Sequence, residues 1–313
     1  MKGLELSEKY YNETGKPVLE KDFGDVMPFL AVGLVGSGSE CFGFDDETSV
    51  DHDFEPSFCI FIPDDENIVS SQTAFRLERA YKSLQKDFCG YKVQGVSPAG
   101  GSRRGVIRIG DFYQSKTGHR DGSLSLEEWC TVPEFFISEA VNGKIFFDNY
   151  GKFSEIRRNL SSMPRDALLK RLAGNLAAAA QSGEYNYLRC ISHGETAAAQ
   201  LTLFEFEKAA VNSFFLINET YQPYFKWKYR ALRSFPDSVD IAEKLEFLIS
   251  SPNGYDNIDS KLEIIASVTN RLVKKCTEKY DLQNSTGLEG VSFALNDKIS
   301  DVRLRNESIF YCV

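Results

Sequence analysis

Two aspartates, Asp51 and Asp53, stand at alternate positions just before an apolar run of the chain. Side chains two residues apart in a strand point to the same side, so both carboxylates would face one point while His52 faces away. Two converging carboxylates repel each other unless a cation lies between them, and hard oxygen ligands suit Mg²⁺ or Mn²⁺. The spacing therefore predicts a divalent-metal site.

A turn rich in glycine and serine precedes this pair. Residues 36–43 read GSGSECFG and follow FLAVGLV at 29–35, a pattern that predicts a buried strand. A strand that runs through such a turn into the start of a helix offers backbone N–H groups and a hydroxyl to phosphate. A phosphate-binding turn next to metal-binding acids predicts ATP or another nucleoside triphosphate as the ligand.

Composition restricts the partners of the chain. Its 313 residues carry a formal net charge of -9, which argues against the broad basic face of a general DNA or RNA binder, so we expect no long nucleic acid partner. No stretch is long enough to span a membrane, and the first residues lack the apolar core of a signal peptide. We therefore expect no membrane association.

The cysteines predict the redox environment. There are 7 of them, an odd number, and no pair has the CxxC spacing. This usage favours neither a disulfide framework nor a zinc site, and it is typical of a cytoplasmic protein.

The order of predicted elements indicates an α+β protein. Apolar runs predict strands at 29–35, 57–62, 105–109 and 144–147. After about residue 151 the pattern is helical, as in ALLKRLAGNLAAAAQ, where leucines and alanines recur at the intervals of a bundle helix. We therefore expect two domains, 1–152 with a small sheet and 153–313 built from helices. The aromatic residues of the helical part are compatible with a homodimer.

The turn and the acid pair also carry a resemblance to a known superfamily. Gly38-Ser39-Glu40-Cys41-Phe42-Gly43, followed by Asp51-His52-Asp53-Phe54, resembles the GSxxxG turn and the paired acids of the DNA polymerase β-like nucleotidyltransferases. Gly36-Ser37 does not fit, because no glycine stands four positions after its serine. The chain is similar to the kanamycin, streptomycin and lincosamide nucleotidyltransferases of that superfamily.

A narrower resemblance covers most of the chain. The segment GSGSECFGFDDETSVDHDF at 36–54, together with IGDFY at 109–113, YNYLRC at 185–190 and YQPYFKWKYRAL at 221–232, resembles the uncharacterised bacterial DUF4037-type family.

The superfamily resemblance implies a fold and a reaction. The fold would be a small mixed β-sheet catalytic domain followed by an all-α helical-bundle domain that binds the acceptor. The reaction would transfer a nucleoside monophosphate, with AMP as the expected case, to a hydroxyl of a small acceptor. Asp51 and Asp53 would hold the metal, while Gly38 and Ser39 would hold phosphates. The alternative is a nucleotide-binding or regulatory protein that keeps the fold without turnover, although the intact acids favour the enzyme.

The resemblance implies two further site residues. The superfamily usually adds a third carboxylate from a later strand, and Asp111 is the candidate for this catalytic and metal-binding position, with Glu134 as the alternative. The glycine before Asp111 departs from the usual apolar flank. Relatives also contact the triphosphate with a lysine from the helical domain, for which Lys226 is the candidate.

Charged residues near the turn leave several interpretations open. Many relatives carry arginine where this chain has Glu40, and an acid there weakens phosphate binding unless it points away or binds metal. The acids 45–47 are either a solvated loop or an attraction for a cationic acceptor such as an amino sugar. Arg103 and Arg104 either contact phosphates or are solvated.

Overall fold

The computed structural model describes residues 1–46, 55–93, 104–282 and 285–313, and it divides them into two compact units. The first unit comprises residues 1–124 and 133–162, and the second comprises 125–132 and 163–313. The division differs from the expected boundary between 152 and 153. Helix α7 (Lys152–Leu160) belongs to the first unit because its buried Phe153 packs against Phe61 of the sheet, with ring centroids 4.2 Å apart.

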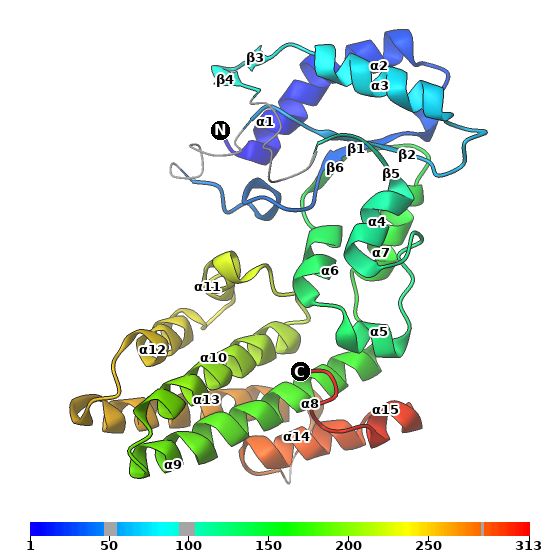
Figure 1. The fold of residues 1–313 in the computed structure, drawn as a ribbon. Helices are drawn as coiled ribbons and strands as arrows, with labels where there is room; N and C mark the ends of the chain where they lie inside the picture. The colour runs from blue at the N-terminus through cyan, green and yellow to red at the C-terminus, as the bar shows by residue number, and fades with distance from the viewer. Residues whose placement is uncertain (47–54, 94–103, 283–284) are drawn as a thin grey trace. The chain divides into compact units, whose positions relative to one another are not determined.

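Among the described residues of the first unit, four strands form one mixed sheet (Figure 1). Their order is β5-β2-β1-β6; β1 is antiparallel to both of its neighbours, whereas β2 and β5 are parallel. The strands are β1 (Ala31–Leu34), β2 (Cys59–Ile62), β5 (Gly105–Arg108) and β6 (Lys144–Asp148). All four predicted strands are therefore confirmed. A separate hairpin joins β3 (Asp87–Phe88) to β4 (Tyr91–Lys92).

Helices cover both faces of this sheet because its central strands are apolar on both sides (Figure 1). Ile60 and Ile62 of β2 join the core formed with the first three helices. Phe61 points to the other face, where its ring lies 5.2 Å from that of Phe112. The helices of the first unit are α1 (Gly3–Tyr10), α2 (Lys16–Asp22), α3 (Ser71–Ser83), α4 (Ile109–Thr117), α6 (Glu134–Val141) and α7.

The regular elements described in the second unit are all helical. Long helices α8 and α10 pack against each other, and α14 packs against α8. The helices are α5 (Leu126–Thr131), α8 (Arg165–Ala179), α9 (Tyr187–Ser192), α10 (Thr196–Ile217), α11 (Lys228–Leu232), α12 (Val239–Ser250), α13 (Tyr255–Tyr280), α14 (Gly287–Asp297) and α15 (Val302–Asn306). A small mixed sheet followed by helices confirms the α+β class, while the nucleotidyltransferase character of the fold stays a prediction.

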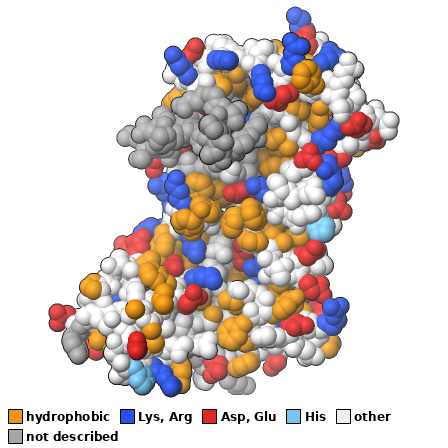
Figure 2. All heavy atoms as spheres, in the orientation of Figure 1, with side chains coloured by type: hydrophobic (Ala, Val, Ile, Leu, Met, Phe, Trp, Pro, Cys, Tyr) orange, Lys and Arg blue, Asp and Glu red, His pale blue; other side chains and the backbone are white. Residues whose placement is uncertain are grey.

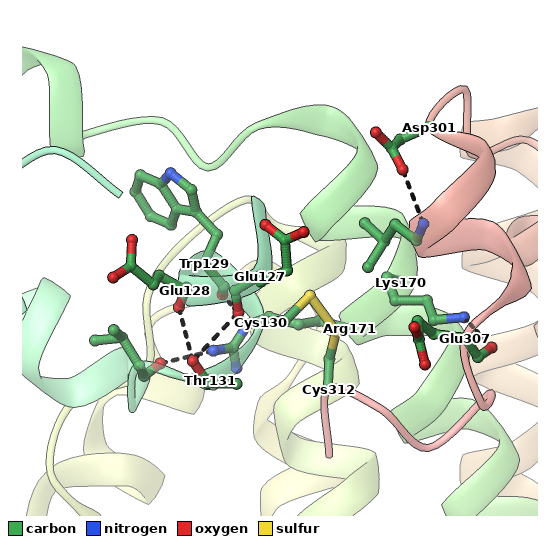
Figure 3. Close-up of a disulfide and its surroundings, with 12 residues drawn as sticks. Glu127, Glu128, Trp129, Cys130, Thr131, Lys170, Arg171, Asp301, Glu307 and Cys312 are labelled. Carbon is green, nitrogen blue, oxygen red and sulfur yellow. Dashed lines mark hydrogen bonds between the residues drawn. A yellow bond between two sulfur atoms is a disulfide. The ribbon is translucent and has the colours of Figure 1, made fainter. Parts of the chain in front are cut away.

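A disulfide joins Cys130 of α5 to Cys312, across 182 residues of sequence (Figure 3). The cysteine count argued against a disulfide framework, and this bond corrects the expectation, because a count contains no information about which thiols meet in space. The segment that carries Cys312 is also held by Lys170 of α8, whose Nζ donates to the Glu307 carbonyl at 2.8 Å. The disulfide thus connects α5 to the 307–313 segment within the second unit.

None of the helices that the structure describes combines the length and the apolar character needed to cross a bilayer. On the face drawn in Figure 2, acidic and basic side chains are intermixed over the described surface.

Candidate functional site

Strand register brings the Gly-Ser turn, which follows β1, beside the segments that lead into β2, β5 and β6. We call this end of the strands the site edge. Gly33, near the end of β1, pairs with Cys59 at the start of β2, and Cys59 pairs with Gly105 at the start of β5. Leu34 pairs with Lys144 at the start of β6. The residues that follow β1 therefore lie beside those that lead into β2, β5 and β6.

The turn after β1 adopts conformations that glycine permits. Gly36 has a φ of 98° and Gly38 a φ of 129°, both in the region that L side chains rarely adopt. A Cβ on Gly38 would also lie 2.4 Å from a carboxylate oxygen of Glu40. A single 3-10 turn, Glu40–Phe42, follows and ends at Gly43. The predicted glycine-rich turn is present, and its backbone path requires glycine.

At the positions predicted to bind phosphate, the turn has polar groups without hydrogen-bond partners in the described chain. Gly38 and Ser39 are partly exposed, and their N–H groups donate to no acceptor among the described residues. The Ser39 hydroxyl likewise makes no hydrogen bond within the described part of the chain. Two adjacent N–H groups and a hydroxyl at a bend are donors that an oxyanion can accept from.

Asn142 fixes the start of the turn. Its Oδ1 accepts from the Gly36 N–H at 2.8 Å, and its Nδ2 donates to the Gly36 carbonyl at 2.7 Å. The next residue, Gly143, donates its N–H to the Cys41 carbonyl at 2.9 Å. Sequence reasoning missed Asn142, and its only local signal is an Asn-Gly pair before a strand, which is typical of an ordinary turn.

Glu40, the acid at which the sequence departs from the resemblance described above, is neutralised by Arg104. The two side chains form an ion pair, with the Arg104 side chain 14% exposed and that of Glu40 13% exposed. The same guanidinium lies beside the thiols of Cys41 and Cys59. Burial raises the pKa of the Cys41 thiol to about 12, so this thiol stays protonated and unreactive. Arg104 is therefore neither a solvated charge nor free to bind phosphate. Its pairing with Glu40 cancels the negative charge that would otherwise repel a phosphate.

Of the acids at 45–47, Asp45 contacts the start of the first helix. Asp45 is buried, and its Oδ2 accepts from the Gly3 N–H at 2.9 Å. The Lys2 ammonium donates to its carbonyl. Asp45 is thus buried against the start of the first helix and is not part of a solvated loop. Glu47 and Arg103 lie outside the described residues.

Asp111 lies at the opposite edge of the sheet. It occupies the first turn of α4, directly after the carboxyl end of β5. Because β5 is parallel to β2, and β2 begins at the site edge, β5 ends at the opposite edge. Its side chain is 56% exposed and pairs with Arg120 at 2.5 Å. Arg120 also pairs with Asp64, whose carboxylate accepts from the Gly110 N–H at 3.2 Å. This position does not favour Asp111 as the third carboxylate. The alternative, Glu134, is buried at the start of α6.

The remaining predicted residues stay predictions. Asp51, His52 and Asp53 lie outside the described residues. Lys226 lies in the second unit, exposed in a 3-10 segment, with its ammonium 5.8 Å from the centre of the Trp227 ring. Within the described ranges, no group of three or more His, Cys, Asp or Glu side chains is arranged to hold a metal ion.

These features define an α+β protein with a glycine-serine turn at a sheet edge, and comparison with known proteins adds one finding. Residues 129–228 match the model of a family described as a domain of unknown function, DUF4037. The match supports the DUF4037 part of the resemblance. It begins in α5 and ends at the start of α11, so the turn at 36–43 lies outside it. Neither a curated protein nor a solved structure matches the chain.

Proposed function

We propose that the protein is a nucleotidyltransferase that moves a nucleoside monophosphate, with AMP as the expected case, from a nucleoside triphosphate to a hydroxyl of a small acceptor. The observation that carries the proposal is the turn at Gly38 and Ser39. Its positive φ angles, its N–H groups without an acceptor in the described chain and its neutralised acid suit a polyphosphate.

The paired acids support the same ligand. In the sequence, Asp51 and Asp53 stand four and two residues before Glu55, from which the described chain continues into β2 at the site edge. We expect their carboxylates to hold Mg²⁺ or Mn²⁺ close to the turn. The bound metal supplies neutralisation of the phosphate charge.

The reaction balances without a further cofactor. The acceptor oxygen forms a bond to the α-phosphorus, the bond between the α-phosphorus and the bridging oxygen breaks, and pyrophosphate leaves. The acceptor proton passes to a base or to solvent. The contribution of the chain is to orient the triphosphate along the turn, so that positioning and charge neutralisation lower the barrier.

A direct test incubates the protein with each labelled nucleoside triphosphate, Mg²⁺ and an extract of small metabolites. We expect pyrophosphate release and a nucleotidylated product. Asp51→Asn and Asp53→Asn should each lower the rate by about a hundredfold or more, because a metal ligand is lost. Asp25→Asn, an exposed acid of the same unit, is the control and should leave the rate unchanged.

Two outcomes would contradict the proposal. Normal turnover by both aspartate variants would remove the metal site from the reaction. Tight binding of ATP without pyrophosphate release, whatever the acceptor, would instead favour a nucleotide-binding protein without turnover.

A further inference from the structure

Arg157 of α7 is half-buried and carries a charge that the described chain does not neutralise. Its Nη2 donates to the Gly143 carbonyl at 3.1 Å. Its Nη1 is buried and has no hydrogen-bond partner. None of the described carboxylates forms an ion pair with it. The neighbouring Arg158 is exposed to solvent, whereas Arg157 is half-buried.

A guanidinium nitrogen is costly to bury without a hydrogen-bond partner, and Nη1 of Arg157 is such an atom. Arg cannot release its proton at physiological pH, so the charge persists although burial lowers its pKa. Most buried polar groups have a partner, and buried charges are normally paired. Arg171, a buried arginine of the second unit, follows this rule by donating to the carbonyls of Trp129 and Val132 (Figure 3). The unpartnered Nη1 of Arg157 therefore requires an explanation, whereas Arg171 does not.

The position of Arg157 connects it to both ends of the Gly-Ser turn. The Gly143 residue that it binds donates its N–H to Cys41, which follows the turn. Asn142, one residue earlier, holds Gly36 at the beginning of the turn by two hydrogen bonds. Arg104 is paired with Glu40, whereas Arg157 has no carboxylate partner in the described chain.

We propose that Arg157 is a positioning residue for the terminal phosphates of a bound nucleoside triphosphate. It anchors Gly143 under the turn, and its charge, which lacks a counter-ion in the described chain, stabilises the polyphosphate that the turn amides receive. The identity of the anion rests on the proposed nucleotidyl transfer. The unpartnered Nη1 of Arg157 is an observation on the described residues alone.

The experiment measures binding of inorganic triphosphate with excess Mg²⁺ by titration calorimetry. This probe has no nucleoside to transfer, so its binding is independent of turnover. We expect Arg157→Gln to weaken binding by about tenfold or more and Arg157→Lys to stay within about threefold of the wild type, because lysine keeps the charge. Arg158→Gln, the matched control, should bind as the wild type does.

Two further readouts separate charge from structure. Affinity should fall with salt less steeply in Arg157→Gln than in the wild type, because one interacting charge is missing. Arg157→Met, a second neutral variant, serves if the glutamine variant does not fold.

The result can refute the role of Arg157 independently of the proposed nucleotidyl transfer. Wild-type affinity in a folded neutral variant, or equal losses in Arg157→Lys and Arg157→Gln, would sink the role of the charge even if nucleotidyl transfer is observed. A wild type that fails to bind triphosphate would also sink it. If binding depends on Arg157 and no acceptor is ever nucleotidylated, the anion site stands and the transfer reaction falls.

Discussion

The two edges of the same sheet hold arginine–carboxylate clusters of opposite character. At the site edge, Arg104 and Glu40 pair with side chains only 14% and 13% exposed. At the other edge, Arg120 bridges Asp111 and Asp64, and the three side chains are 46%, 56% and 41% exposed. Water and salt screen the charges of the second cluster, whereas each charge of the first cluster needs an opposite charge within the protein.

This difference shows that position along the sequence does not by itself place a carboxylate at one end of the sheet or the other. Asp111 stands after an apolar strand, as a metal ligand would, but β5 is parallel to β2, so its carboxyl end lies away from the Gly-Ser turn. Glu40 looks unfavourable in the sequence, but the buried pair with Arg104 makes it part of the support of the turn. Three substitutions test this comparison.

The largest effect is expected from Arg104→Gln. It would leave the Glu40 carboxylate buried without its partner, and breaking a buried pair in this way costs roughly 3–5 kcal/mol of unfolding free energy. Urea unfolding followed by circular dichroism measures the loss. The exposed counterpart, Arg120→Gln, should unfold at nearly the same urea concentration as the wild type, and equally small effects of both variants would contradict the comparison.

A smaller effect is expected from Asn142→Ala. It would remove both hydrogen bonds that hold Gly36, and leaving these backbone groups unsatisfied costs roughly 1–3 kcal/mol. Affinity for ATP should fall as well, because the turn loses its support. Asn142→Asp is the matched variant, since it keeps the acceptor for the Gly36 N–H and loses the donor. Unfolding and nucleotide titration check both expectations, and an alanine variant with wild-type stability and affinity would refute them.

The smallest effect is expected from Asp111→Asn. Its carboxylate is exposed at the far edge and pairs only with an exposed arginine among the described residues, so pyrophosphate release should stay within about twofold of the wild type. The rate is compared with that of Asp53→Asn in the same assay. A loss as large as that of Asp53→Asn would restore Asp111 to the metal site.

Local patterns were sufficient for much of the fold. The apolar runs at 29–35 and 57–62 contain β1 and β2, and Pro63 directly follows the end of β2. The helical repeat ALLKRLAGNLAAAAQ, residues 167–181, lies mostly within α8. The strand expected at 105–109 ends one residue early, because Ile109 already begins α4. The nature of these elements follows from periodicity, whereas their exact ends depend on neighbours.

The sequence by itself determined the α+β class, the glycine-rich turn and the pairing of acids that directs attention to residues 36–53. Glycines and alternating side chains act within a few bonds, so their consequences are visible locally. Only the tertiary structure decided that Asn142 holds Gly36, that Cys130 meets Cys312 and that Asp111 lies at the far edge. Those contacts join residues separated by 106 and 182 positions, or depend on strand direction, and neither follows from spacing along the chain.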